Sequence, residues 1–185
     1  MKISILLPYK ENFSPTYAGA VSIFLKDTIQ LSKFKKNILV FGNTNYKKKL
    51  LKNYKNLPFK PSFLRSNSKL YLNMFIENEN KKKSDLIEIH NRPDYVDKLS
   101  NINENLVLYF HNNPQDMKSS ISLYDRINLL KKTKKIIFNS KWTKSKFLQG
   151  LKINNEYKKK LDVIYQSTSS KKVNFRNKKK YIIFV

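Results

Sequence analysis

The sequence contains no cysteine and no apolar stretch long enough to cross a membrane. Without cysteine the chain has no disulfide, no thiolate metal ligand and no cysteine nucleophile, which fits a reducing compartment. No apolar run approaches the roughly 20 residues of a membrane-spanning helix. The N-terminal stretch MKISILLPYK has too short an apolar run for a signal peptide and lacks an A-x-A-like cleavage site. These absences predict a soluble cytoplasmic protein.

Glycine is also scarce, with only three residues in the chain. The glycine-rich motifs that hold dinucleotides and ATP, G-x-G-x-x-G and the P-loop, are both absent. The nucleophile elbow G-x-S-x-G, the zincin motif H-E-x-x-H and a clear pair of carboxylates are absent as well. The sequence therefore predicts no bound cofactor or metal, and it gives no motif for a hydrolase.

Acidic residues are few, because 13 Asp and Glu stand against 38 Lys and Arg, which gives a net charge of +25 at pH 7. Such a charge predicts anionic partners: nucleic acid, acidic lipid head groups or phosphorylated substrates. Only four of the basic residues are Arg, the residue preferred for specific recognition of bases and phosphates. Lysine accompanied by many Asn and Ile is equally typical of an AT-rich genome, so both explanations of the charge stay open.

Apolar and aromatic residues are abundant enough for a core, with 40% apolar residues, 12 Phe and 11 Tyr. Short apolar runs alternate with helix-like segments, and most runs are continuous, as in strands buried on both faces of a parallel sheet. The predicted strands are Ile3–Leu7, Ile38–Phe41, Leu86–Ile89, Leu106–Phe110, Ile136–Phe138, Val163–Tyr165 and Tyr181–Val185. The predicted helices are Ala18–Phe34, Ser66–Ser84, Ser119–Lys132 and Ser140–Gln149.

Repeated β-α-β units predict the α/β class, with a Rossmann-like, doubly wound parallel sheet of about six or seven strands. We expect this domain to span residues 1–165. Residues 166–180 are polar and basic without an apolar period, so they are interpreted as a linker. Residues 181–185 then begin a buried strand that must pair elsewhere or belong to a longer protein.

Ligands of open α/β sheets bind beyond the carboxyl ends of the strands, where several segments of this chain are informative. Ala18, Gly19 and Ala20 open a predicted helix. The glycine either lets backbone N–H groups approach an anion at the positive helix end or serves a tight turn into a closely packed helix. Ser140 is a predicted N-cap, which either serves structure alone or points its hydroxyl into the same cleft, and Gly150 ends that helix.

The only two histidines, His90 and His111, each end an apolar run and are each followed by an asparagine, Asn91 or Asn112. Equivalent strand ends predict a shared cleft, where imidazoles hydrogen-bond sugar hydroxyls or phosphate. Metal binding is not favoured, because no third histidine or carboxylate cluster accompanies them. Arg92 either supplies a forked phosphate contact or is a solvated loop charge.

The motifs follow the order seen in a known family. The N-terminal domain of GT-B glycosyltransferases of the family 4 type, which use nucleotide-diphospho-sugars, is similar in the pieces ISILLP, AGAVSIFLKDTIQLSK, NILVFG, SDLIEIHNRPDYV, NLVLYFHNNP, KKIIFNSKWTKSKF, LDVIYQS and KKKYIIFV. The resemblance covers nearly the whole chain but about the first half of a family member. It implies that residues 181–185 open a second Rossmann-like domain, and that the function is sugar transfer to a lipid-linked acceptor or a cell-surface glycan such as lipopolysaccharide.

The resemblance also implies roles for individual residues. The loop of Ala18, Gly19 and Ala20 would face the phosphates of the donor, where the family usually has Gly-Gly. His111 would be the cleft histidine near the transferred sugar and the candidate catalytic residue. The other cleft residues, nearer the acceptor, would be His90, Asn91, Arg92, Asn112 and Ser140.

The second domain of the family carries an E-x7-E motif and the basic residues that stabilise the departing diphosphate, and neither is present here. We therefore expect the chain alone to be inactive. The alternative function is a non-enzymatic basic α/β module that binds nucleic acid or acts as a partner subunit. No RRM pattern or other recognition motif supports the nucleic-acid alternative.

The lysine-rich segment Asn45–Lys60 is predicted to begin as a short helix with Leu50, Leu51 and Tyr54 on one side and lysines beside them. Such a helix either packs on the sheet as an ordinary surface helix or makes a peripheral contact with the inner membrane leaflet. In the second case each lysine near an anionic surface contributes about 1 kcal/mol.

Overall fold

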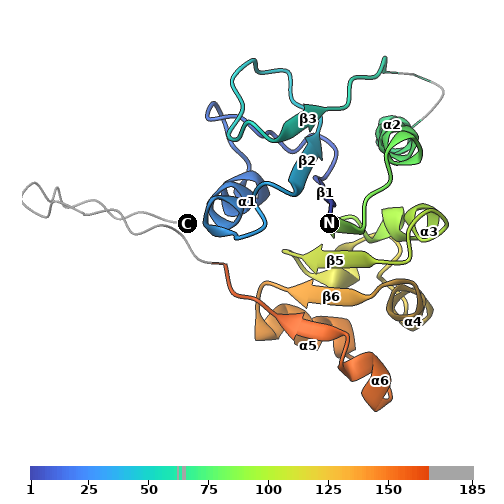
Figure 1. The fold of residues 1–185 in the computed structure, drawn as a ribbon. Helices are drawn as coiled ribbons and strands as arrows, with labels where there is room; N and C mark the ends of the chain where they lie inside the picture. The colour runs from blue at the N-terminus through green and yellow to red at the C-terminus, as the bar shows by residue number, and fades with distance from the viewer. Residues whose placement is uncertain (62, 64–65, 167–185) are drawn as a thin grey trace, which may run out of the picture.

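The computed structural model describes residues 1–61, 63 and 66–166, which form a seven-stranded sheet flanked by helices (Figure 1). All neighbouring strands are parallel, in the order β3-β2-β1-β4-β5-β6-β7. This is the predicted Rossmann-like, doubly wound α/β fold, whose strand order reverses beside β1. The strands are β1 (Ile3–Leu6), β2 (Ile38–Gly42), β3 (Tyr54–Asn56), β4 (Leu86–His90), β5 (Leu106–Phe110), β6 (Lys135–Phe138) and β7 (Leu161–Val163).

One face of the sheet is covered by several helices, which Figure 1 shows in part as α2, α3 and α4 along one side. Phe75 of α2 packs edge-on against Phe41 of β2, and Phe147 of α5 packs against Phe138 of β6. β5 is buried along its whole length, which explains its continuous apolar sequence. The helices on this face are α2 (Asn67–Lys81), α3 (Val96–Leu99), α4 (Leu123–Lys132) and α5 (Lys141–Leu148).

The opposite face is covered by α1 (Ala20–Leu31), which lies over β1 and β2 (Figure 1). Val21, Leu25 and Ile29 are spaced four residues apart and turn toward the sheet, where they join the core. Beside α1, over the central strands, this face is hollowed into an apolar groove of about 300 Å³. Phe24 of α1 and Val107 of β5 are among its lining residues.

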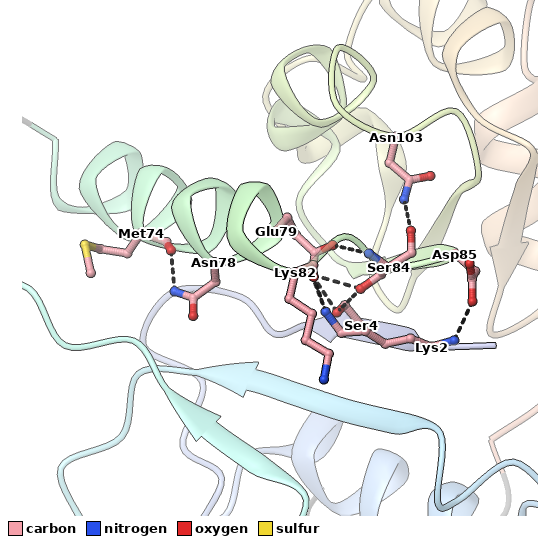
Figure 2. Close-up of polar contacts among 9 residues, drawn as sticks. All are labelled: Lys2, Ser4, Met74, Asn78, Glu79, Lys82, Ser84, Asp85 and Asn103. Carbon is pink, nitrogen blue, oxygen red and sulfur yellow. Dashed lines mark hydrogen bonds and ion pairs between the residues drawn. The ribbon is translucent and has the colours of Figure 1, made fainter.

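A buried carboxylate ties α2 to β1 and to the loop before β4 at the amino edge of the sheet (Figure 2). Glu79 is only 2% exposed, and it accepts hydrogen bonds from Ser4 Oγ at 2.7 Å and from the backbone N–H of Ser84 at 2.8 Å. Lys2 Nζ lies 3.8 Å from the same carboxylate, and Asn103 donates to the Ser84 carbonyl at 2.7 Å. Because this charge is hydrogen-bonded and paired, its burial is compatible with a stable fold.

The segment Asn45–Lys60 does not begin as a helix, and the prediction was wrong there. It contains β3 instead, an edge strand paired with β2. Asn53 Nδ2 donates to the carbonyl of Ile38 at 2.8 Å, and the ring of Tyr54 stacks on Phe13 with 5.1 Å between centroids. These long-range contacts outweigh the local helical pattern.

Most other elements lie within a few residues of their predicted ends. β7 (Leu161–Val163) begins two residues before its predicted start at Val163. α4 begins after Ser122, where Ser122 and Asp125 form a capping box, and not at Ser119. Gly150 ends the α5 region in the left-handed conformation, with φ of 77°.

Within the described ranges, no helix combines the length and apolar character that crossing a bilayer requires. The predicted linker beyond residue 166 and the predicted strand 181–185 fall outside the described residues. Three further short helices lie in the described ranges: η1 (Pro93–Tyr95) and η2 (Pro114–Asp116) follow β4 and β5, and α6 (Asn155–Lys158) precedes β7.

Candidate functional site

The residues singled out from the sequence lie at the carboxyl edge of the sheet. His90 is the last residue of β4, His111 follows β5 directly, and Ser140 follows β6. Gly19 precedes α1, the helix that follows β1. Because all four strands are parallel, these positions share one edge, beside the point where the strand order reverses.

The two histidines are in direct contact. His90 Nδ1 lies 2.7 Å from His111 Nε2, and the rings are 5.1 Å apart. The other nitrogen of His90, Nε2, lies 2.6 Å from Glu88 Oε1. Glu88 comes two residues earlier on β4, so its side chain is on the same face of the sheet. The outer nitrogen of His111, Nδ1, hydrogen-bonds the side-chain amide nitrogen of Gln166, which completes a chain of four linked side chains.

Aromatic rings surround this chain of hydrogen bonds. Tyr109 stacks on His111 with 4.4 Å between centroids and 14° between planes, and it stacks on His90 at 5.3 Å. Phe24 of α1 meets the rings of Tyr109 and His111 edge-on at 5.3 and 5.5 Å. Burial, assisted by the charge of Glu88, raises the pKa of Tyr109 to about 12. The site therefore has apolar walls.

His111 is neutral at physiological pH. Burial, and second the neighbouring His90, lower the pKa of His111 to about 3, because both disfavour a charged ring. A neutral imidazole donates from one nitrogen and accepts at the other. Such a ring suits a hydroxyl group better than an ion.

The backbone of His111 is held from both neighbouring loops. Asn91 Oδ1 accepts from the backbone N–H of His111 at 2.7 Å, and Asn139 Nδ2 donates to its carbonyl at 2.7 Å. Asn91 adopts the left-handed conformation, with φ of 51°, which asparagine tolerates better than most residues. Asn112 is exposed next to His111.

The guanidinium of Arg92 is engaged within its own loop. Its Nε and Nη2 donate to the two oxygens of Asp94 at 2.9 and 2.7 Å, and Nη2 also donates to Ser68 Oγ at 2.6 Å. The guanidinium lies 4.4 Å from the ring centre of Tyr95. A phosphate at this point would compete with Asp94 for the forked edge.

An anion already lies at the N-terminus of α1, and it belongs to the protein. Glu11 Oε1 accepts from the backbone N–H of Ser22, in the first turn, at 3.0 Å. A Cβ on Gly19 would stand 2.0 Å from that oxygen, so a larger residue would displace the carboxylate. Ala18 and Ala20 flank this position. Gly19 therefore makes room for a carboxylate at the positive end of the helix.

Ser140 acts as the N-cap of α5, as its sequence position indicates. Its Oγ accepts from the backbone N–H of Thr143 at 3.1 Å and lies 2.9 Å from Thr143 Oγ1. Thr143 Oγ1 also donates to Asn139 at 2.7 Å, which links the cap to the loop that holds His111. The hydroxyl of Ser140 thus serves the helix end.

Three residues of this edge were not identified from the sequence: Glu88, Gln166 and Glu11. Glu88 had a usable signal, because residues two apart on a strand share a face with each other. Gln166 lies 55 positions from its partner His111, and Glu11 lies 11 positions from Ser22. Neither of those pairs has a local periodicity.

Comparisons of the sequence with protein-family models and with curated proteins give no match. Among the described residues, no group of three or more His, Cys, Asp or Glu side chains is placed to hold a metal ion. The argument for a functional site at this edge therefore rests on the geometry of the two histidines and their neighbours.

Proposed function

We propose that the chain is the acceptor-side part of a glycosyltransferase that moves a sugar from a nucleotide-diphospho-sugar to a cell-surface glycan or lipid-linked acceptor. The observation that carries the proposal is the direct pairing of His90 and His111 at the carboxyl edge, where the strand order reverses. The order of motifs shared with GT-B transferases of the family 4 type supports it.

The surroundings of His111 suit a sugar. Carbohydrates present hydroxyl groups together with apolar ring faces, and the site offers a neutral imidazole between the rings of Tyr109 and Phe24. In the proposal His111 contacts the transferred sugar and is the candidate catalytic residue. His90 positions His111, and Asn112 lies exposed where an acceptor would approach.

The N-terminus of α1 is the candidate neighbour of the donor diphosphate. Backbone N–H groups at a helix start and the helix dipole favour an anion there. The carboxylate of Glu11 occupies that position, so a donor phosphate would have to displace it or bind beside it. Gly19 offers no side chain that would crowd either anion.

The proposed enzyme needs more than this domain. Transfer requires stabilisation of the charge that develops on the leaving diphosphate, and the acidic E-x7-E motif and basic residues of the family's second domain are not in the sequence. The proposal therefore includes weak binding of nucleotide-sugars and no turnover by these 185 residues alone.

The alternative, a basic module for nucleic acid or a partner protein, is supported by the net charge of +25. Single-strand binding usually pairs basic residues with free aromatic rings. In the lysine-rich segment Asn45–Lys60, Tyr46 is exposed, whereas the ring of Tyr54 is stacked on Phe13 with 7° between planes. The net charge does not account for the paired histidines, which nucleic-acid binding does not require, so the transferase is the better-supported function.

The test is reconstitution. The purified chain and the product of the intact gene are each assayed with a panel of nucleotide-diphospho-sugars and membrane extract as acceptor. We expect transfer only when a donor-binding second domain with the E-x7-E motif is supplied, either in one chain or as a separate half. Sugar transfer by the purified 185-residue chain would contradict the proposed need for a second domain. Absence of transfer by the intact product would contradict the proposed glycosyltransferase function.

A further inference from the structure

The chain of hydrogen bonds that ends at His111 begins on the face of the sheet. Glu88 and His90 project from the same face of β4, 2.6 Å apart, and His90 is fully buried. His111 follows at 2.7 Å and brings the chain to the carboxyl edge. The side chain of Glu88 is 23% exposed, so one end of the chain is partly hydrated while its centre is dry.

The directions of the hydrogen bonds in this chain follow from its two ends. An ionised carboxylate only accepts, so the hydrogen between Glu88 and His90 must be on His90 Nε2. A second hydrogen on His90 Nδ1 would make His111 accept at Nε2 and place its own hydrogen on Nδ1, against the Gln166 amide, so His90 Nδ1 is the acceptor. His111 Nε2 must then donate to it. His111 therefore has its hydrogen on Nε2 and a bare lone pair on Nδ1.

The remaining contact agrees with that direction. Nδ1 of His111 meets the amide nitrogen of Gln166, a group that can only donate. The low pKa of His111, about 3, keeps the ring neutral at physiological pH, so the lone pair stays available. The carboxylate at one end and the amide N–H at the other thus fit one and the same tautomer of His111.

We infer that Glu88 is a positioning residue that fixes His111 as a hydrogen-bond acceptor, so that the ligand group replacing the Gln166 amide is a hydroxyl and not a phosphate oxygen. This inference rests on the proposed function for the identity of the hydroxyl, which would belong to a sugar. The phosphates of a nucleotide-diphospho-sugar are diesters that carry no hydrogen at neutral pH, so their oxygens would meet the lone pair of Nδ1 repulsively. Gln166 holds the place of the ligand until it binds.

The tautomers can be measured directly in the 185-residue chain labelled with ¹⁵N-histidine, because imidazole nitrogen shifts distinguish protonated from bare nitrogens. At about pH 7 we expect His90 and His111 both to be protonated at Nε2 alone. In Glu88→Gln the side-chain amide can donate as well as accept, so a mixture of tautomers should appear at both rings. Asp162→Asn is the matched control, because Asp162 is a carboxylate of β7 that bonds Lys135 at 2.6 Å and does not touch the histidines.

Protonation of His111 at Nδ1 in the wild-type chain would overturn the inference, and so would unchanged single tautomers in Glu88→Gln. Gln166→Ala, which exposes Nδ1, supplies a second test. Dimethyl phosphate, a diester without a hydrogen to donate, should leave its Nδ1 shift unchanged, and a protonation of Nδ1 that depends on this diester would contradict the exclusion of anions. A chain with the expected tautomers that belongs to no active transferase would support this inference and count against the proposed function alone.

Discussion

The carboxylate of Glu11 lies where a side chain on Gly19 would have to be. Its Oε1 is 2.0 Å from the position of a Cβ at Gly19, and the same oxygen accepts from the backbone N–H of Ser22 at 3.0 Å. One of the three glycines of the chain is thus explained by an intramolecular anion at the start of α1. The site that the sequence suggested for a donor phosphate is already filled by the protein's own carboxylate.

This relationship predicts strong coupling between the two positions. Gly19→Ala should displace Glu11 and remove its helix cap, at a cost of about 1–2 kcal/mol in the free energy of unfolding, and Glu11→Ala alone should cost about 1 kcal/mol. In the double variant the clash is gone, so adding Gly19→Ala to Glu11→Ala should cost at most about 0.5 kcal/mol. Urea unfolding of the four proteins measures the coupling, and strictly additive effects would contradict the contact.

A pH dependence follows from the low pKa of His111. The pKa of this ring is 6.5 in an unfolded chain and about 3 in the fold. Below about pH 6.5 the unfolded chain gains a proton that the folded chain does not. The stabilisation of the fold by the neutral His111 ring is therefore fully present above that pH and declines toward pH 3. His111→Asn removes this titration. Its urea midpoint should therefore fall less between about pH 7 and pH 5 than that of the wild type, and equal falls would contradict the burial of a neutral ring.

The buried carboxylate at the opposite edge predicts a large effect on stability. Glu79→Ala removes the acceptor of the Ser84 N–H and of the Ser4 and Ser84 hydroxyls. These hydroxyls lie 2.6 Å apart and can satisfy only one of their two hydrogens with each other, and each buried donor left without an acceptor costs about 1–3 kcal/mol. We expect a loss of about 3 kcal/mol by chemical denaturation. Glu77→Ala is the matched control, because Glu77 is exposed on the same helix and should change stability by less than about 0.5 kcal/mol. Similar losses for both variants would show that the network is not what stabilises this edge.

The fold was predictable where the chain is buried on both faces. A continuous apolar run such as Leu106–Phe110 has the same bounds in the sequence prediction and in β5. The edge strand β3 was not found, because its residues alternate in burial and carry lysine, and its position depends on β2 and on Phe13. The local sequence pattern predicts an edge strand poorly, because contacts with neighbouring elements determine where such a strand forms.

For the candidate site, the positions of residues in the sequence indicated that they lie at the carboxyl edge of the sheet, but not which side chains they contact there. The two histidines were recognised from equivalent strand ends, and the structure brings them within 2.7 Å. Ser140 was recognised as a cap from its local spacing. Glu88, Glu11 and Gln166 act through contacts that only the fold creates, so their roles could not be derived from spacing along the chain.

The lysine-rich segment Asn45–Lys60 keeps its charges on the surface although it contains a strand and not a helix. Four exposed lysines at about 1 kcal/mol each would hold the domain on an anionic membrane reversibly. We expect the chain to sediment with anionic vesicles and to be released from them by salt. It should not sediment with neutral vesicles. Charge reversal should be made at Lys47, Lys48, Lys52 and Lys55, and in a control protein at the exposed Lys81, Lys82, Lys83 and Lys131.

Reversal in the lysine-rich segment should lower vesicle binding far more than the control reversal. Both proteins carry the same net charge, so the comparison isolates position from total charge. Equal losses would mean that the attraction is diffuse, and the composition of an AT-rich genome would then explain the lysines better than a membrane contact.

The central claim, that His111 contacts the sugar in a transferase, is tested most directly by the turnover of the intact gene product with changes at this one residue. His111→Ala removes a hydrogen bond and should lower turnover about 5- to 150-fold, equivalent to about 1–3 kcal/mol, whereas His111→Asn keeps an acceptor oxygen and should lose less. The order wild type, Asn, Ala in transfer rate is the expected result. Equal, wild-type rates for both variants would contradict the account and leave His111 as a structural residue.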